Sequence, residues 1–85
     1  MRNGEKMLVE VLGTGCTKCK QLYKIVDETL QQAGITAELR KVEDLRTIMD
    51  RGVMMTPALV IDGKTVSAGR LPKKEELLAL LQGGQ

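Results

Sequence analysis

The sequence predicts an α/β protein with the element order β-α-β-α-β-β-α, in which three helices pack on a four-stranded mixed sheet. Along most of the chain, short apolar runs typical of strands alternate with stretches in which apolar residues recur every three or four positions, as on one face of a helix. An Asp-Gly pair at residues 62–63 then separates two short strand-like segments, which is a strong hairpin signal. A chain of 85 residues has room for one small domain, so we expect residues 1–85 to form a single unit.

The first strand and the first helix are predicted from a change of period. Residues 7–12 (MLVEVL) are apolar except for Glu10, which is typical of a strand that lies inside a sheet with both faces covered. From Cys16 onward the apolar side chains follow helical spacing, at positions 19, 22, 26, 30 and 33. Gly34 is suited to end this helix, because glycine readily adopts the left-handed conformation found at helix C-termini.

The second strand and the second helix are shorter predictions. Residues 35–42 (ITAELRKV) alternate in part between apolar and polar side chains, which favours a half-exposed strand at the edge of the sheet. Residues 43–51 place Leu45, Ile48 and Met49 on one face of a short helix that ends at Gly52. A helix between the first two strands implies that they are parallel and joined by a right-handed crossover.

The final part of the chain predicts a hairpin and a last helix. Residues 58–61 (ALVI) and 65–68 are strand-like, and the turn between them makes the two strands antiparallel. Gly69 ends the second of these strands, and Pro72 lies near the first turn of the last helix, where its missing N–H is harmless. Acidic residues 75 and 76 suit the positive end of that helix, and leucines 77, 80 and 81 form its apolar face. Residues 83–85 are expected to fray.

Composition and charge exclude several classes of function. The net charge is +2 with acids and bases interspersed, which is too mild for a nucleic-acid or membrane surface. A single aromatic residue, Tyr23, provides no stacking platform for single-stranded nucleic acid. The apolar run at residues 7–12 is far shorter than a membrane span, and no signal peptide is recognisable. We therefore expect a cytoplasmic monomer that binds neither nucleic acid nor a membrane.

Both cysteines of the chain lie in GTGCTKCK at residues 13–20, where the first strand gives way to the first helix. Cys16 at the helix start would lie near unpaired N–H groups and the positive end of the helix dipole, which lower the pKa of a thiol. Cys19 lies one turn later, on the buried stripe. We therefore expect Cys16 to be the nucleophile and Cys19 the resolving thiol of a redox couple. Lys18 and Lys20 either add positive charge nearby or form a solvated helix face.

Other interpretations of the cysteine pair stay open. A tetrahedral zinc site needs four ligands, and this chain offers two cysteines and no histidine, so we expect no metal site. A soft metal such as copper would find sulfur ligands in Cys16, Cys19 and methionines such as Met54 and Met55, which otherwise serve packing or docking. An inert pair is a further alternative. A structural disulfide is disfavoured, because closing a two-residue loop constrains the unfolded chain very little and disulfides in a reducing cytosol are mostly transient or catalytic.

Three stretches together resemble the thioredoxin fold in its minimal, glutaredoxin-sized form. They are LVEVLGTGCTKC at residues 8–19, GVMMTPALVIDGK at 52–64 and SAGRLPKKEELLALL at 67–81, so the resemblance covers nearly the whole chain. The sequence is similar to the small redox-active disulfide proteins of archaea and bacteria. This resemblance implies an oxidoreductase that reduces or exchanges protein disulfides. A Cys16–Cys19 disulfide takes the place of a cofactor, and a thioredoxin-reductase-like or other thiol donor restores the dithiol. A non-catalytic adaptor that uses the same groove is a further alternative.

The resemblance also implies roles for individual residues. The Thr56–Pro57 bond is expected to be cis and its loop to pack against the cysteine pair, with the Thr56 backbone offered to an extended substrate. Glu10 corresponds to a buried acid that relays a proton to the resolving cysteine, here with a pKa raised by burial; alternatively, its side chain reaches solvent at the end of the sheet. The expected substrate-binding residues are Gly15, Thr17, Lys18, Met55, Thr56 and Pro57.

Some positions depart from the family pattern. Thr17-Lys18 stands between the cysteines, where thioredoxins usually have Gly-Pro and glutaredoxins Pro-Tyr, and Gly15 stands where thioredoxins keep a tryptophan. The glutaredoxin pocket for glutathione is not recognisable at residues 67–74. These departures favour a protein disulfide over a glutathione adduct as the substrate.

Overall fold

The structure, a computed structural model, describes residues 7–82. The expected fraying of residues 83–85 lies outside this range. The element order predicted from the sequence is confirmed: β1 (Met7–Leu12), α1 (Thr17–Ala33), β2 (Ala37–Val42), α2 (Leu45–Asp50), β3 (Ala58–Ile61), β4 (Lys64–Ala68) and α3 (Lys74–Gln82).

The four strands form one mixed sheet in the order β2-β1-β3-β4. β1 is parallel to β2, with Met7 opposite Ala37, and antiparallel to β3. β3 and β4 form the antiparallel hairpin. The predicted inner position of β1 and edge position of β2 are therefore confirmed, and the buried strands β1 and β3 form the centre of the sheet.

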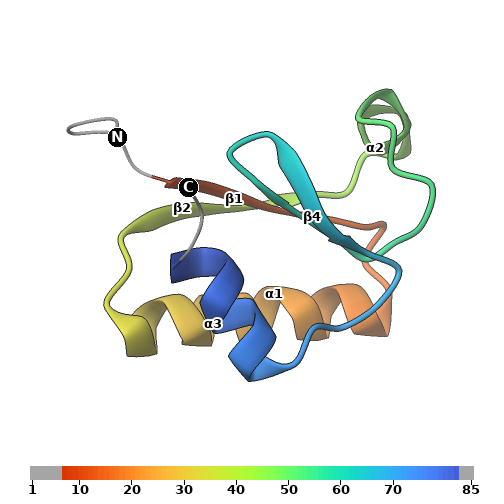
Figure 1. Ribbon diagram of the computed structural model, residues 1–85. Helices are drawn as coiled ribbons and strands as arrows, with labels where there is room; N and C mark the ends of the chain where they lie inside the picture. The colour runs from red at the N-terminus through yellow and green to blue at the C-terminus, as the bar shows by residue number, and fades with distance from the viewer. Residues whose placement is uncertain (1–6, 83–85) are drawn as a thin grey trace.

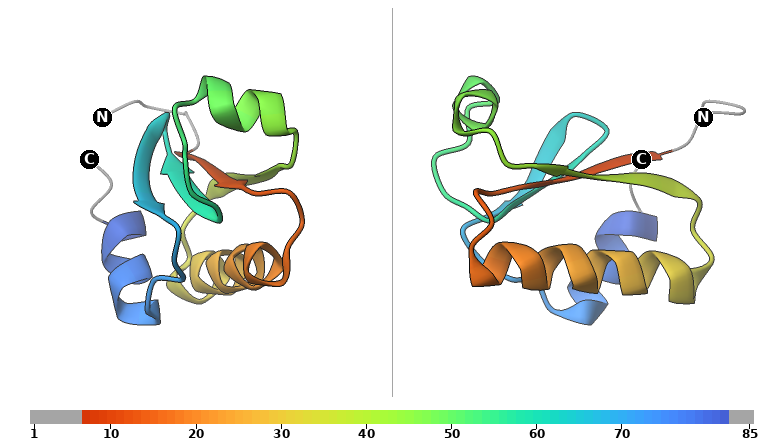
Figure 2. Two further views of the ribbon diagram at one scale, coloured as in Figure 1. Left: turned by 90° about the vertical axis from the view of Figure 1, so that its right-hand side faces the viewer. Right: turned by 180° about the vertical axis from the view of Figure 1, so that it is seen from behind.

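The helices lie on both sides of this sheet. Figure 1 shows α1 and α3 side by side under one face and α2 on the other side, near one end of the strands; Figure 2 shows the same layers from two further directions. Side chains alternate accordingly, because successive residues of a strand point to opposite faces. Val9 and Val11 of β1 pack with Leu22 and Val26 of α1, whereas Leu12 packs on the other side in a smaller cluster with Ile48, Val53, Ala58 and Val60.

The second strand begins two residues later than predicted, because the end of α1 uses the backbone of the intervening residues. Gly34 adopts a left-handed conformation with φ 68°, as expected of the residue that ends this helix. Its amide donates to the Gln31 carbonyl at 3.2 Å, and the Ile35 amide donates to the Leu30 carbonyl at 2.9 Å. These bonds satisfy the last carbonyls of the helix.

The second helix is shorter than predicted, and its expected apolar face is mostly not packed. Asp44 caps its start by accepting a hydrogen bond from the Thr47 amide at 3.0 Å, so the helix begins at Leu45 rather than at residue 43. Ile48 is buried, but the Leu45 and Met49 side chains are 58% and 65% exposed. The helix lies over one end of the sheet (Figure 1), and Ile48 is its buried residue.

The hairpin has the turn predicted from its Asp-Gly pair. Asp62 and Gly63 both have positive φ, 50° and 84°, as a two-residue hairpin turn requires. β4 starts at Lys64, one residue earlier than expected. Among residues 7–82, the structure contains no helix with the length and apolar character that crossing a membrane requires.

Candidate active site

The loop after β1 places Cys16 immediately before the first residue of α1. Cys16 has extended backbone angles and is the N-cap of the helix, and its Sγ accepts a hydrogen bond from the Cys19 amide at 3.2 Å. An N-cap side chain normally satisfies one of the unpaired amides at a helix start, and here a sulfur atom does so. Cys16 is exposed, whereas Cys19 is buried. The sequence-predicted pair thus has one accessible and one sheltered sulfur.

The pKa values of the two thiols are shifted in opposite directions. The pKa of Cys16 is lowered, chiefly because the Cys19 thiol donates a hydrogen bond to its thiolate and also because the Cys19 amide does so. The pKa of Cys19 is raised, chiefly by burial and then by its interaction with Cys16. These shifts make Cys16 the more readily ionised of the two thiols and oppose the loss of the Cys19 proton.

Gly13 allows the loop to pass over Cys19. A Cβ atom on this residue would lie 2.2 Å from the Cys19 Sγ, so a side chain here would displace the resolving thiol. The Gly13 amide also donates to the Val42 carbonyl at 2.9 Å, which fixes the loop to the end of β2. No role was predicted for Gly13 from the sequence, because a single sequence does not reveal a close approach between a glycine and a side chain six residues away.

The segment before β3 lies beside the cysteine pair. The Thr56–Pro57 peptide bond is cis in the structure, and Pro57 is fully buried. The Pro57 Cα lies 3.9 Å from the position that a Gly13 Cβ would occupy. Thr56 is exposed, and the Met55 side chain lies against Gly69. Gly13, Cys19 and Pro57 therefore meet at one end of the molecule, although they come from three different elements.

The remaining predicted substrate-binding residues are partly or fully exposed. Gly15 is half-buried with φ 91°, and Thr17 and Lys18 are exposed on the first turn of α1. Lys20 is also exposed. Met54 is 93% exposed, so it has no packing role.

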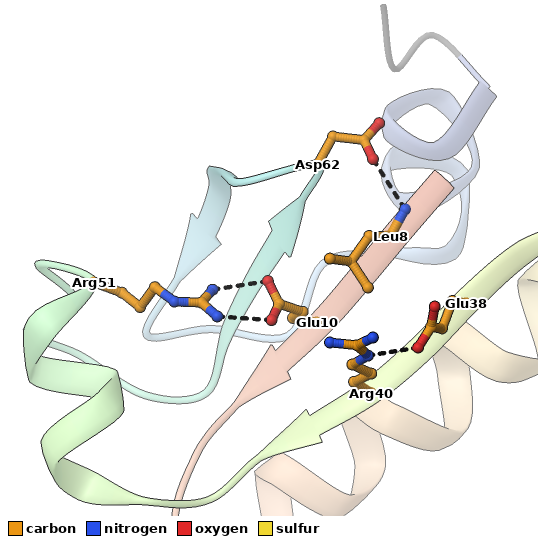
Figure 3. Close-up of polar contacts among 6 residues, drawn as sticks. All are labelled: Leu8, Glu10, Glu38, Arg40, Arg51 and Asp62. Carbon is orange, nitrogen blue, oxygen red and sulfur yellow. Dashed lines mark hydrogen bonds and ion pairs between the residues drawn. The ribbon is translucent and has the colours of Figure 1, made fainter. Parts of the chain in front are cut away.

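Glu10 does not have the surroundings expected of it. Its carboxylate is buried and accepts two hydrogen bonds from the Arg51 guanidinium, at 2.7 and 2.8 Å. Figure 3 shows that Glu10 points to the side of the sheet from which Arg51 approaches, with α1 on the far side. The expected exposure at the end of the sheet is therefore wrong.

The pKa expected for Glu10 is also wrong in direction. The hydrogen bonds and charge of Arg51 outweigh the effect of burial and lower the pKa of Glu10. An ionised carboxylate already held by two donors, on the face opposite α1, is a poor acceptor for the Cys19 proton. Arg51 could not be predicted as the partner of Glu10, because the two residues are 41 positions apart and no local pattern joins them.

The donor set around the cysteines offers sulfur chemistry rather than a preformed metal centre. Within residues 7–82 there is no group of three or more histidine, cysteine, aspartate or glutamate side chains that could hold a metal ion. An exposed sulfur with a lowered pKa can attack a disulfide, and a second sulfur one turn away can displace the attached product.

Comparisons with known proteins agree with this geometry. The model of the family described as "Thioredoxin domain" matches residues 7–82. The chain is 35% identical over 75 residues to a thioredoxin of Methanothermobacter thermautotrophicus, covering 88% of this chain and 97% of that protein. It is 37% identical over 81 residues to a thioredoxin of Methanocaldococcus jannaschii, covering 91% of this chain and 93% of that protein. A solved chain described as the structure of a malarial protein has the same fold, with a TM-score of 0.70 at 15% identity over 93% of this chain and 97% of that one.

Proposed function

The chain belongs to the thioredoxin family, and we propose that it reduces or exchanges disulfide bonds of other proteins through Cys16 and Cys19. The family assignment makes it a thiol–disulfide oxidoreductase. Our assignment of roles is supported by the opposite pKa shifts of the two thiols. The pKa of the exposed Cys16 is lowered, and the pKa of the buried Cys19 is raised.

The proposed reaction transfers two electrons in two displacement steps. The Cys16 thiolate attacks one sulfur of the substrate disulfide, forms a mixed disulfide and releases the other substrate sulfur as a thiolate. Cys19 then loses its proton, and its sulfur attacks the Cys16 Sγ. The Cys16–Cys19 bond forms as the bond to the substrate breaks. Both substrate sulfurs leave reduced and take up protons, while the protein leaves oxidised.

The proposed cycle needs no cofactor beyond the Cys16–Cys19 disulfide. A thioredoxin-reductase-like protein or another thiol donor would reduce this bond, and both halves of the cycle suit a monomer in the cytoplasm. A reducing compartment is favoured because a disulfide across a two-residue loop contributes little to stability.

We further propose that protein substrates dock around the exposed sulfur. The exposed Thr56 would offer its backbone to an extended segment of the substrate, and Met55 would contact apolar side chains beside it. Gly15, Thr17, Lys18 and the buried Pro57 would complete the surface around Cys16. Glu10 is left out of the proposed proton path, because Arg51 holds it on the other face of the sheet.

The test is catalysis of disulfide reduction in a protein substrate such as insulin, with dithiothreitol as the electron source. We expect the wild type to accelerate the reduction, Cys16→Ser to abolish the acceleration, and Cys19→Ser to accumulate a mixed disulfide that mass spectrometry detects. Oxidation of the reduced protein should remove both free thiols while the protein stays a monomer, and dithiothreitol should restore them.

The same measurements separate the proposed function from its alternatives. An adaptor would bind the substrate without turnover, and a soft-metal carrier would retain near-stoichiometric copper after dialysis. Either result, together with no acceleration by the wild type, would contradict the proposed function.

A further inference from the structure

A small cavity lies beside the buried Cys19, on the face of the sheet that α1 covers. Its volume is about 10 Å³, and its lining consists of Val11, Gly13, Gly15, Cys19, Lys20, Lys41 and Glu43. A cavity of this size is close to the minimum of roughly 10–15 Å³ that one water molecule needs, provided that polar groups surround it. The lining residues include Cys19, two lysines and Glu43, so residues with groups able to hydrogen-bond one water lie around the resolving sulfur.

Cys19 needs a proton acceptor in the second displacement step. Burial raises its pKa, so it is a thiol when the mixed disulfide forms, whereas the attacking species must be the thiolate. Glu10 is on the opposite face of the sheet and is already bound by Arg51. An acceptor for this proton within the protein would therefore be a group other than Glu10.

Glu43 lies where such a route would end. It follows β2 directly, and its Oε2 is 3.6 Å from the position that a Gly15 Cβ would occupy, so the carboxylate lies beside the loop that precedes Cys16. Glu43 is exposed and therefore able to pass a proton to solvent. It is the acidic residue in the lining of the cavity that Cys19 also lines.

The other charged and titratable groups around Cys19 are few. Cys16 and Lys20 approach it from α1, and Lys41 approaches the cavity from β2. Val11 of β1 and Gly13 of the loop that follows it also line the cavity, and neither titrates. Lys41 also lies over the Tyr23 ring, with its Nζ 4.9 Å from the ring centre.

We propose that Glu43 accepts the Cys19 proton through this cavity during resolution of the mixed disulfide. The proposal rests on the proposed function and replaces the role that the sequence analysis gave to Glu10. The proton moves from the Cys19 Sγ to a Glu43 carboxylate oxygen by way of one water. The freed electron pair on Cys19 forms the bond to the Cys16 Sγ, the bond from Cys16 to the substrate breaks, and the substrate sulfur leaves as a thiolate.

The test separates the two displacement steps in a single turnover. Dithiobis(nitrobenzoate), a coloured disulfide reagent, is mixed with reduced protein in a stopped-flow instrument. Attack by Cys16 releases a first coloured thiol at a rate that depends on reagent concentration. Attack by Cys19 on the mixed disulfide releases a second at a rate that does not. The first phase reports the proposed function, and the second phase reports the role of Glu43.

We expect Glu43→Gln to leave the first phase unchanged and to slow the second by about tenfold or more near neutral pH, since general-base catalysis contributes roughly 10²–10⁴-fold and water can replace part of it. Glu43→Asp should recover part of the lost rate, because it keeps the carboxylate. The matched control is Glu38→Gln, which removes the same charge from an exposed position on β2 that does not line the cavity. This control should leave both phases unchanged.

The pH profile adds a signature that a structural role would not produce. The second phase should depend less steeply on pH in the wild type than in Glu43→Gln, because in the wild type a group of the protein takes the proton. In Glu43→Gln it should rise with pH as the thiolate fraction of Cys19 rises. If Glu43 acted only through its charge, its removal would make the Cys19 thiolate easier to form and would speed the second phase.

An unchanged or faster second phase in Glu43→Gln would therefore overturn the proposal while leaving the proposed function intact. A wild type that releases one coloured thiol and never the second would contradict both.

Discussion

At the scale of single residues, burial and the hydrogen bonds between Cys16 and Cys19 give these two identical side chains different pKa shifts. Cys16 and Cys19 are one helical turn apart, yet one is exposed at the N-cap and the other lies under Gly13. The Cys19 thiol and amide both stabilise the Cys16 thiolate, and that same interaction opposes ionisation of Cys19. The asymmetry on which the proposed reaction depends is thus a property of the pair rather than of the neighbouring lysines.

The first prediction concerns the reactivity of these two thiols. In the reduced protein near neutral pH, we expect iodoacetamide to modify Cys16 about tenfold or more faster than Cys19, because the thiolate is the reacting species and Cys19 is also shielded. Peptide mass mapping after brief treatment measures both rates. Cys16→Ser should remove the fast reaction. Equal labelling, or labelling of Cys19 first, would contradict the assignment of the nucleophile.

The second prediction concerns the buried carboxylate of Glu10. Arg51→Gln should destabilise the protein by about 2 kcal/mol, less than the ~3–5 kcal/mol typical of a broken buried pair, because the Arg51 side chain is 36% exposed. The control is Arg70→Gln, which breaks the exposed pair with Glu76 and should cost under about 1 kcal/mol. Urea unfolding at neutral pH measures both. Equal losses of unfolding free energy in the two variants would show that the buried Glu10–Arg51 pair stabilises the fold no more than an exposed pair.

The pH dependence of stability should change sign in the same variant. In the wild type the pKa of Glu10 is lowered, so its stabilising contribution is present above the unfolded value of about 4.3 and is lost as pH falls through the lower folded value. Without Arg51, burial becomes the dominant effect and the folded pKa rises above the unfolded one. The contribution of Glu10 should then become more favourable as pH falls from neutral, which unfolding curves at several pH values would detect.

At the scale of elements, local signals determine where each segment begins and ends. Gly34 ends α1, the Asp62–Gly63 turn closes the hairpin, and Asp44 starts α2; the last of these shows how a cap overrides periodicity. The helical pattern extended to residue 43, but the Asp44 carboxylate accepts hydrogen bonds from both the amide and the hydroxyl of Thr47 and so fixes the first turn. A helix cap of this kind can be predicted from a sequence only if capping residues are considered together with the spacing of the apolar residues.

The third prediction tests this cap. Asp44→Ala should destabilise the protein by about 1 kcal/mol, because it leaves the Thr47 amide without its side-chain acceptor. Asp44→Asn is the matched control, since asparagine caps helices about as well as aspartate and should cost little. Denaturant unfolding of the two variants measures the difference. Equal losses would mean that the negative charge, rather than the hydrogen bond, is what matters at this position.

At the scale of the whole molecule, the contacts that sequence reasoning found are those encoded locally, and those it missed join distant segments. The order of helices and strands along the chain follows from short apolar runs, helical spacing and a turn signal, each contained within a few residues. The partner of Glu10 and the cavity shared by Cys19 and Glu43 arise only when β1, β2 and the end of α2 are brought together. The family resemblance predicted a buried acid at Glu10 but not its partner, because Arg51 is not part of the motifs that carry the resemblance.

The arrangement of the core further implies that the molecule is not equally stable throughout. α1, α3 and the centre of the sheet share the larger apolar cluster, whereas α2 contributes one buried side chain, Ile48, to the smaller one. Otherwise α2 is fixed by its Asp44 cap and by the Glu10–Arg51 pair. Segments with few buried apolar contacts open locally at a lower free energy than the rest. α2 leads directly into the segment that carries Thr56 and Pro57, so its opening would also move the proposed substrate-docking surface.

The last prediction is that native-state hydrogen exchange resolves these two levels. Amides at the centre of the sheet, in β1 and β3, should exchange only through global unfolding, with a rate that rises steeply with denaturant. The amides of Ile48 and Arg51, which donate to the Asp44 and Thr47 carbonyls, should exchange faster and with little dependence on denaturant. Arg51→Gln should speed exchange in α2 beyond the change expected from its lower global stability, and Arg70→Gln should not. If instead every amide exchanged at one common free energy, α2 would be as firmly held as the sheet, and the Glu10–Arg51 pair would be acting on the whole fold rather than on one element.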